Sequence, residues 1–277
     1  MNVKETLVRN GFTFSKRFGQ NFLTDGNLLA AIVEDAEVTA EDVVLEIGAG
    51  AGTLTAALAD KARQVVAYEI DERLRPVLAS TLADYDNVEV IYQDFMRADV
   101  EELRARFAHA KIVANLPYYV TTPILMRLLE EGIGDSVTVT VQKEVAERLT
   151  AAPDTKEYGA ITVKINLVGR AYVTRVIGRH MFFPPPNVDS AVVHIVRVEG
   201  QYDDPYPDLS AKLARAAFAM RRKTLVNNLM TLSIPRTIAE EAMASIGLPV
   251  AVRGETLSAA EFVRLAAALV AAGVQPR

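Results

Sequence analysis

The stretch Val43-Val44-Leu45-Glu46-Ile47-Gly48-Ala49-Gly50-Ala51-Gly52 joins a run of apolar, mostly β-branched residues to a glycine-rich turn. A segment in which apolar residues recur with helical spacing follows from Thr53. Glycines between a strand and a helix let the backbone turn tightly and approach a ligand closely. The stretch therefore predicts an opening strand, turn and helix of an α/β fold, with a ligand site at the turn.

Six more runs rich in β-branched residues predict the other strands of the sheet. Four of them alternate with helical segments such as Leu54–Ala62 and Leu74–Leu82, and they are Val65–Ile70, Val88–Tyr92, Lys111–Ala114 and Ser136–Val141. This alternation favours right-handed crossovers and a doubly wound, mostly parallel sheet. The last two runs, Ala171–Ile177 and Ser190–Val198, predict a hairpin-like pair at the end of the sheet.

The remainder of the chain predicts a small helical domain. Gln201–Asp208, rich in Tyr, Asp and Pro, is typical of a linker. Helical spacing follows in Leu209–Leu232, Ile238–Ile246 and Ser258–Ala271, the last of which begins with a capping box formed by Ser258 and Glu261. We therefore expect two domains, residues 1–200 and residues 201–277.

Composition narrows the class of protein. The chain has 277 residues, 50% of them hydrophobic, and a net charge of −5, which excludes collagen and wholesale disorder and argues against an indiscriminate nucleic-acid binder. Cysteine is absent and the three histidines are widely spaced, so we expect no thiolate chemistry and no metal site. No signal peptide and no stretch of about 18 apolar residues is present, so we expect a cytoplasmic protein without membrane contact.

Three acids at successive strand ends point to the kind of ligand. The glycine spacing is G-x-G-x-G, not the G-x-G-x-x-G of dinucleotide binders, and Glu46 before it suits a methionine-derived cofactor with a sulfonium and an amino-acid end. Glu69 is placed to accept hydrogen bonds from ribose hydroxyls, and Asp94 from an adenine amine. A lone acid at such a position is more often a helix cap, but all three lie at the carboxyl edge of one sheet.

The segment Asn115-Leu116-Pro117-Tyr118-Tyr119 follows the fourth strand and predicts a site for an amine-bearing base. The Asn115 side-chain oxygen and a main-chain carbonyl near Pro117 would accept the two hydrogens of an exocyclic amine, while Tyr118 stacks on the ring. The amine lone pair would then face a cofactor methyl group. The alternative is a turn in which both tyrosines serve only for packing.

Together, these segments resemble the ribosomal RNA adenine dimethyltransferase family over nearly the whole chain. Further matching segments are Lys16–Leu23, Val141–Leu149, Phe182–Val192 and Arg221–Leu225. The resemblance implies a Rossmann-like, class I S-adenosylmethionine-dependent methyltransferase with S-adenosylhomocysteine as product, acting as a monomer without a metal. It is strongest to bacterial members that convert two adjacent adenosines near the 3′ end of 16S rRNA to N6,N6-dimethyladenosine in the pre-30S subunit.

The resemblance also implies individual roles. It makes Asn115, Leu116, Pro117, Tyr118 and Phe182 the catalytic set, with Phe182 covering the adenine opposite Tyr118, although the adjacent Phe183 is an alternative. The implied cofactor contacts are Asn21, Leu23, Gly48, Gly50, Glu69, Ile70, Asp94, Phe95 and Asn115.

Two basic regions offset the acidic total. Leu209–Arg236 contains six cations and no acid, and Met1–Leu23 contains four cations and one acid. Such runs are often only solvated helix faces, but phosphate binding needs local positive charge of this kind. We expect RNA contacts from Arg221, Arg222, Lys223, Lys212, Arg215, Lys16 and Arg17.

Three other functions are compatible with parts of the sequence. A nicotinamide-dependent oxidoreductase would share the sheet but should show the dinucleotide glycine spacing. A 23S rRNA adenine N6-methyltransferase of the macrolide-resistance type would share the cofactor motifs, although its usual segment is Asn-Ile-Pro-Tyr or Asn-Ile-Pro-Phe. A ribosome-assembly factor that mainly binds RNA would have no need for intact pocket residues.

Overall fold

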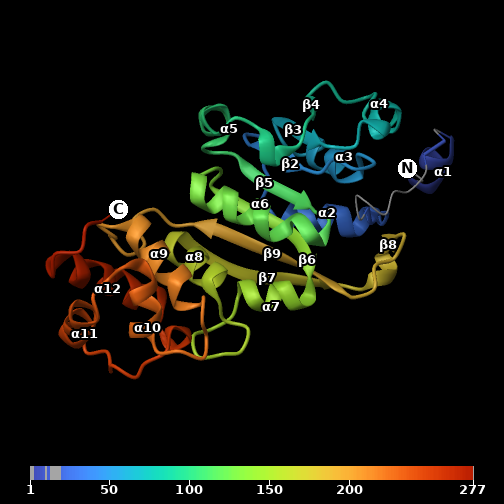
Figure 1. The fold of residues 1–277 in the computed structure, drawn as a ribbon. Coiled ribbons are helices and arrows are strands. Elements are labelled where there is room, and N and C mark those ends of the chain that lie inside the picture. Colours follow the sequence, from blue (N-terminus) through green and yellow to red (C-terminus); the bar gives the residue numbers. More distant parts are fainter. Residues whose placement is uncertain (1–2, 10, 13–19, 277) are drawn as a thin grey trace. The chain divides into compact units, whose positions relative to one another are not determined.

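The computed structural model describes residues 3–9, 11–12 and 20–276 and divides into two compact units (Figure 1). Unit 1 comprises Met1–Ala146 and Tyr172–Val196, and unit 2 comprises Glu147–Ala171 and Arg197–Arg277. This division differs from the predicted one at residues 200 and 201, because Tyr158 and Val163 are buried in the core of the C-terminal helices. The chain therefore crosses between the two units three times.

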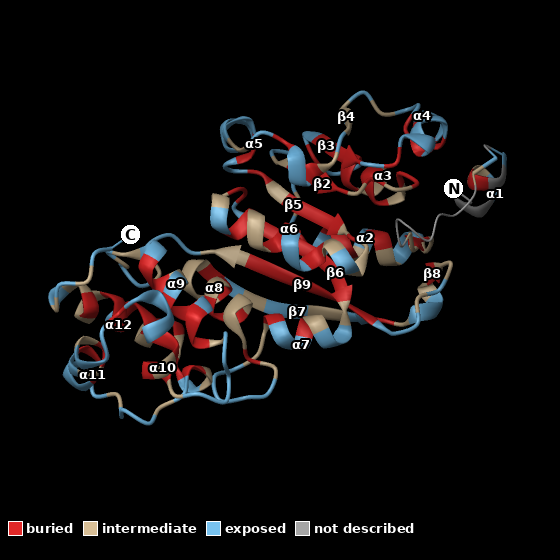
Figure 2. Cartoon of the chain, in the orientation of Figure 1, coloured by how far each residue is buried: buried red, intermediate tan, exposed pale blue. Residues whose placement is uncertain are grey.

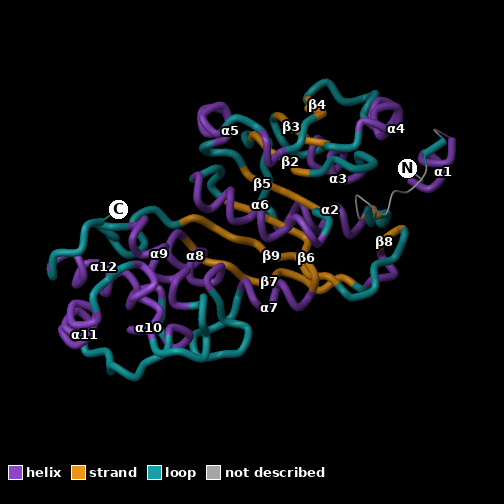
Figure 3. Tube along the Cα trace, viewed as in Figure 1, coloured by secondary structure: helices purple, strands orange, loops and turns teal. Residues whose placement is uncertain are grey.

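Unit 1 contains a seven-stranded sheet in the order β4-β3-β2-β5-β6-β9-β7 (Figure 3). All pairs from β4 to β6 are parallel, and β9 runs antiparallel to β6. The predicted mostly parallel sheet and the predicted pair of adjacent strands at its end are thus confirmed. The strands are β2 (Val43–Ile47), β3 (Gln64–Glu69), β4 (Val88–Tyr92), β5 (Lys111–Asn115), β6 (Ser136–Gln142), β7 (Gly169–Ile177) and β9 (Ser190–Arg197).

The register of the parallel strands determines which residues share one edge of the sheet. Ile47 pairs with Tyr68 and with Ala114, and Glu69 pairs with Tyr92. The carboxyl ends of β2 to β5 therefore lie together, where open α/β sheets bind their ligands.

Helices cover both faces of the sheet, which is why its central strands are buried on both sides (Figure 2). The helices α2 and α3 pack on the face that presents Val44, Val65 and Val113. Tyr68 belongs to the opposite face, with α5 and α6. The helices of this part of the chain are α1 (Val3–Arg9), α2 (Gly26–Asp35), α3 (Thr53–Ala59), α4 (Arg75–Thr81), α5 (Val100–Phe107), α6 (Tyr118–Glu131) and α7 (Lys143–Leu149), with short 3-10 helices at Glu72–Leu74, Phe95–Arg97 and Arg179–Met181.

A second sheet of only two short strands joins distant parts of unit 1. The strand β1 (Phe22–Leu23) runs antiparallel to β8 (Phe182–Phe183), with Phe22 opposite Phe183 and Leu23 opposite Phe182. Sequence analysis did not predict this pair, because two residues are too few to show a strand periodicity.

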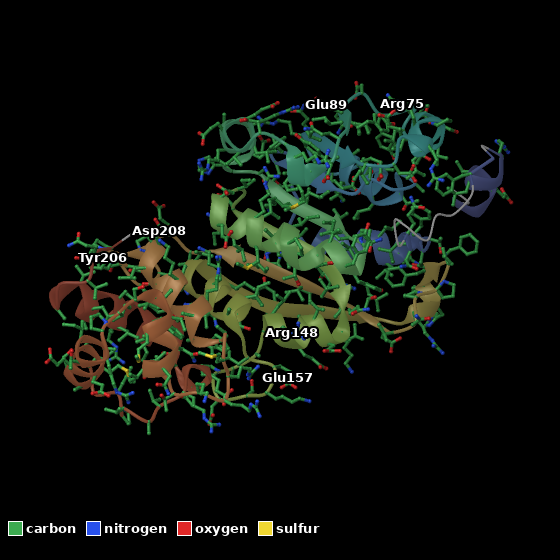
Figure 4. All side chains as sticks on the ribbon, in the orientation of Figure 1. Arg75, Glu89, Arg148, Glu157, Tyr206 and Asp208 are labelled. Atoms are coloured by element: carbon green, nitrogen blue, oxygen red, sulfur yellow. The ribbon has the colours of Figure 1, made fainter. Side chains whose placement is uncertain are left out.

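Unit 2 is built around a helical core. Its helices are α8 (Ala160–Val168), α9 (Pro207–Ala217), α10 (Leu225–Leu229), α11 (Arg236–Ser245) and α12 (Ala259–Ala271), with 3-10 helices at Met230–Leu232 and Gly254–Thr256. Figure 4 labels Tyr206 and Asp208 at the start of α9, and Arg148 and Glu157 on the segment before α8. The capping box of Ser258 and Glu261 is confirmed.

The helical spacing of Leu209–Leu232 corresponds to more than one helix. The helix α9 ends at Ala217, and α10 begins only at Leu225. The buried side chain of Asn228 donates to the carbonyls of Ala217 and Met220, which satisfies acceptors that a continuous helix would have used. The basic residues 221–223 therefore lie in the turn between two helices.

Candidate active site

The glycine turn after β2 adopts a conformation that other residues rarely take. Gly48, Gly50 and Gly52 have φ angles of +85°, +58° and +81°. Gly50 is further restricted by Phe22, whose ring carbon would lie 2.9 Å from an added Cβ. The turn therefore needs glycine both for its backbone angles and for the close approach of β1.

Glu69, at the end of β3, holds the glycine turn in place. Its two carboxyl oxygens accept hydrogen bonds from the backbone N–H groups of Gly50 and Asp71, each at 2.8 Å. Glu69 is 5% exposed, and burial raises the pKa of its carboxyl group even though these two N–H groups favour the ionised form.

Asp71 extends this arrangement to the N-terminal segment. Its buried carboxylate accepts from the Gln20 side chain at 2.9 Å and from Arg73, whose guanidinium is held at 2.7 and 2.8 Å. The guanidinium and the Gln20 amide keep the Asp71 pKa below its usual value against the effect of burial. Asp71 was not among the predicted site residues. It stands between Glu69 and Glu72, and nothing in the sequence distinguishes it from an ordinary surface acid.

The predicted cofactor and catalytic residues gather around one cavity within unit 1. Every one of them lines it, including Asn21 and Leu23 from the N-terminal segment and Phe182 from β8. The lining residues on which the predictions rest are Asn21, Leu23, Glu46, Gly48, Gly50, Glu69, Ile70, Asp94, Phe95, Asn115, Leu116, Pro117, Tyr118 and Phe182. Phe183 is half-buried and lies outside this lining, and its backbone pairs with Phe22.

Glu46 contributes an unpartnered acid to the wall of the cavity. Its side chain is fully buried, and neither carboxyl oxygen has a hydrogen-bond partner among the described residues. Burial raises the Glu46 pKa to about 8; the Thr55 hydroxyl opposes this rise, and the Glu69 charge adds to it. A buried carboxyl without a partner favours a ligand that brings positive charge or hydrogen-bond donors, and a sulfonium cofactor with an ammonium group meets this requirement.

Asp94 both caps a 3-10 helix and lines the cavity. Its Oδ1 atom accepts from the Met96 N–H at 2.9 Å and so caps the 3-10 helix Phe95–Arg97. The same residue lines the cavity, with Phe95 and Met96 beside it. A cap and a cavity wall are compatible because a carboxylate has more acceptor positions than one N–H uses.

The segment after β5 places three groups at the other side of the cavity. The Asn115 Nδ2 atom donates to the carbonyl of Asn21 at 3.2 Å, so the amide oxygen is the end left for the cavity. The Tyr118 hydroxyl lies 2.8 Å from Ser190 Oγ, which fixes the ring at the start of α6. The Pro117 carbonyl already accepts from the Val120 N–H and the Thr121 hydroxyl.

Most of the predicted RNA contacts lie in unit 2. Lys212, Arg215, Arg222 and Lys223 are exposed, as is Arg221, but the Arg221 guanidinium pairs with Glu255 at 3.1 Å. Arg236 pairs with Glu240. The predicted contacts Lys16 and Arg17 lie outside the described residues.

The described residues contain no group of three or more acidic, histidine or cysteine side chains suited to a metal ion. Buried His194 is bonded through Nδ1 to the Thr138 hydroxyl at 2.7 Å, and burial lowers its pKa. His109 and His180 are exposed. Within the described part of the chain, no helix is both long and apolar enough to span a bilayer.

The chain is similar over nearly its whole length to the members of one protein family. Residues 11–269 match the profile of the family described as ribosomal RNA adenine dimethylase. A ribosomal RNA small subunit methyltransferase A from Bacillus pumilus is 46% identical, over 96% of this chain and 94% of that protein.

Two solved structures share the fold. A dimethyladenosine transferase from Plasmodium falciparum superposes with a TM-score of 0.76 at 24% identity, over 91% of this chain and 98% of that one. The 23S rRNA methyltransferase ErmE superposes with a TM-score of 0.68 at 28% identity, over 90% of this chain and 100% of that one. The expected Rossmann-like methyltransferase class is confirmed.

We predict that burial of Glu46 makes the ligand-free protein less stable as the pH rises. The unfolded chain ionises this carboxyl near its ordinary pKa of 4.5, whereas the folded protein keeps it protonated up to about pH 8. Stability should therefore fall between these values, by up to about 1.4 kcal/mol per pH unit from this group, and level off above pH 8. Urea unfolding from pH 5 to 8.5 measures the slope.

The matched control is Glu46→Gln, which keeps the shape of the side chain and removes its titration. Its free energy of unfolding should decline less steeply over the same pH range, while all other titrating groups are unchanged. Equal slopes for the two proteins would show that Glu46 ionises normally in the folded state.

Proposed function

Because the chain belongs to the ribosomal RNA adenine dimethylase family, we propose that it transfers methyl groups from S-adenosylmethionine to N6 of two adjacent adenosines near the 3′ end of 16S rRNA. The products are N6,N6-dimethyladenosines, formed in the pre-30S subunit during its assembly. The observation that carries the proposal is the single cavity in which acids for the cofactor meet Asn115, Tyr118 and Phe182. The 46% identity to a small-subunit enzyme supports 16S rRNA over 23S rRNA as the substrate.

The carboxyl edge of the sheet would supply the acceptors for the cofactor. S-adenosylmethionine, when bound, supplies a methyl group already activated by its sulfonium centre. Glu69 would accept hydrogen bonds from the ribose hydroxyls, and Asp94 from the adenine amine. The glycine turn would let the cofactor approach the backbone closely, because its glycines have no side chains in the way. Glu46 would offer its carboxylate to the cationic end of the cofactor. The backbone of Asn21 and Leu23 would close the remaining wall.

Asn115 would hold the target amine. Because its Nδ2 atom is engaged by the Asn21 carbonyl, Oδ1 is the atom that would accept one hydrogen of adenine N6. The Pro117 carbonyl has two donors already, which leaves the Leu116 carbonyl as the second acceptor. Acceptors on both hydrogens favour a tetrahedral nitrogen as positive charge develops, an electrostatic contribution to transfer.

Tyr118 and Phe182 would hold the ring of the flipped adenine between them. Each aromatic face contributes about 1 to 3 kcal/mol to holding a base, and stacking is retained when one N6 hydrogen has been replaced by a methyl group. In the second transfer one acceptor contact is lost, so the stacked pair carries more of the binding. Alignment of the nitrogen with the methyl group is the main contribution of the site, and the displaced proton can leave to water.

The site of methylation is tested by incubating the protein with radiolabelled S-adenosylmethionine and separately purified 30S and 50S particles from cells that lack the modification. We expect label in the 30S particles only, at two adjacent adenosines near the 3′ end of the 16S rRNA. Label in 50S particles would instead assign the chain to 23S rRNA, and absence of transfer to either particle would favour an assembly factor that only binds RNA.

Replacing Asn115 should separate catalysis from binding. Asn115→Ala removes the side-chain acceptor, and loss of one preorganised hydrogen bond of this kind lowers kcat by about 100- to 1,000-fold. Affinity for 30S particles should change little, because the phosphate contacts lie elsewhere. Single-turnover methylation and a filter-binding assay provide the two measurements. Near-normal dimethylation by Asn115→Ala would refute the assigned role.

The basic turn of unit 2 should account for part of the salt dependence of RNA binding. We propose that Arg222 and Lys223, exposed between α9 and α10, contact phosphates, with Lys212 and Arg215 on α9 as further contacts. The double change Arg222→Gln with Lys223→Gln should reduce the slope of log affinity against log salt by about 0.7 to 0.9 per lost phosphate contact.

Arg236→Gln is the control for this change, because Arg236 already pairs with Glu240. Its effect on the slope should be smaller than that of the double variant. An unchanged slope in the double variant would exclude the turn as a phosphate-binding surface.

A further inference from the structure

Arg127, in the middle of α6, reaches across to the turn that follows β4. Its Nη1 atom donates to the Phe95 carbonyl at 2.6 Å, and its Nη2 atom donates to the Ala98 carbonyl. The guanidinium carbon also lies 5.5 Å from the centroid of the Phe95 ring. The half-buried Arg127 side chain thus contacts both ends of the 3-10 helix Phe95–Arg97 and the ring of Phe95.

This turn forms the wall of the cavity that carries Asp94. Phe95 is 4% exposed and packs edge-on against Tyr68 at a centroid distance of 5.4 Å. The other hydrogen bonds of the turn are local: Asp94 caps Met96, and its carbonyl accepts from the Arg97 N–H. Local bonds preserve the shape of the turn but do not fix its position against the rest of the unit.

The helix that carries Arg127 also carries the target-base residue. The helix α6 begins at Tyr118, directly after Asn115-Leu116-Pro117. Residues 118 and 127 are nine positions apart, which is about 13 Å along a helix. The turn 94–98 is therefore attached through Arg127 to α6, the helix that begins at Tyr118.

We propose that Arg127 is a positioning residue for the adenosine half of the cofactor. It fixes the turn 94–98 against α6, so that Asp94, Phe95 and Met96 stay at the distance from Tyr118 that the cofactor must span. The inference rests on the proposed function, in that it takes the adenine to lie at Asp94.

The contacts require arginine rather than any cation. A guanidinium is planar and presents several N–H groups in a fixed fork, so it can bridge two carbonyls and stack on a ring at once. A lysine ammonium carries the same charge but lacks this fork and this plane. Arg127→Lys should therefore fail to replace the wild-type residue.

The test is calorimetric binding of two ligands to the full chain: S-adenosylhomocysteine, which has both halves, and methylthioadenosine, which lacks the amino-acid half. In Arg127→Met the affinities for both should fall by the same factor, of about 10-fold or more, since two charge-assisted hydrogen bonds to the turn are lost. Arg127→Lys should lose at least about threefold for both ligands.

Arg104→Met is the matched control. Arg104 also donates to a carbonyl across elements, that of Glu131 at 2.9 Å, but its partners Glu101 and Glu131 do not line the cavity, whereas the Arg127 partner Phe95 does. It should bind both ligands as the wild-type protein does. Hydrogen exchange of the described segment 94–98 provides a second readout, and it should be faster in Arg127→Lys than in Arg104→Met even without ligand.

The results distinguish a failure of the Arg127 role from a failure of the proposed function. Wild-type affinity in folded Arg127→Lys, or a loss for S-adenosylhomocysteine without a loss for methylthioadenosine, would overturn the role of Arg127 and leave the proposed function intact. If the unaltered protein binds neither ligand, the proposed function itself fails.

Discussion

The hydrogen bonds from Gly50 and Asp71 to the Glu69 carboxylate are the constraint on which the site depends. Burying a carboxylate is unfavourable unless its oxygens find donors, so the two N–H groups and the acid must stay together. That requirement fixes the glycine turn against the end of β3. It also places Asp71 where its own carboxylate can bind Gln20, and so the N-terminal segment is fixed in turn.

The segment 20–23 links the glycine turn on one side of the cavity to Asn115 and Phe182 on the other. Phe22 lies against Gly50, the Leu23 carbonyl accepts from the Thr53 hydroxyl at 3.1 Å, and the Asn21 carbonyl orients Asn115. Its strand β1 then pairs with β8, which supplies Phe182. These four residues therefore contact Asp71, the glycine turn, Asn115 and Phe182. The group that orients Asn115 is the main-chain carbonyl of Asn21. Because every residue has such a carbonyl, no sequence motif could predict this contact.

Sequence predicted the parts of the molecule that are set by local pattern. The parallel strands and the acids at their ends follow from short apolar runs and glycine spacing, and the register then brings Glu69 and Asn115 to one edge without further information. The break before α10 was missed because it depends on a buried asparagine reaching back to Ala217. The placement of residues 147–171 in unit 2 depends on packing of Tyr158, and Arg127 acts through contacts 29 and 32 residues away. Such long-range contacts leave no periodicity in the sequence.

The pairing of β1 with β8 has a consequence for the order in which the cavity is built. The two strands are separated by about 160 residues, which a ribosome adds in roughly 8 to 32 s at 5 to 20 residues per second. The residues of the glycine turn and Glu69 are synthesised early in this interval, and residues 94–98 follow soon afterwards. During the remaining interval β1 has no partner strand, because the residues of β8 have yet to be translated. The strand that supplies Phe182 to the cavity is thus synthesised well after the other lining residues.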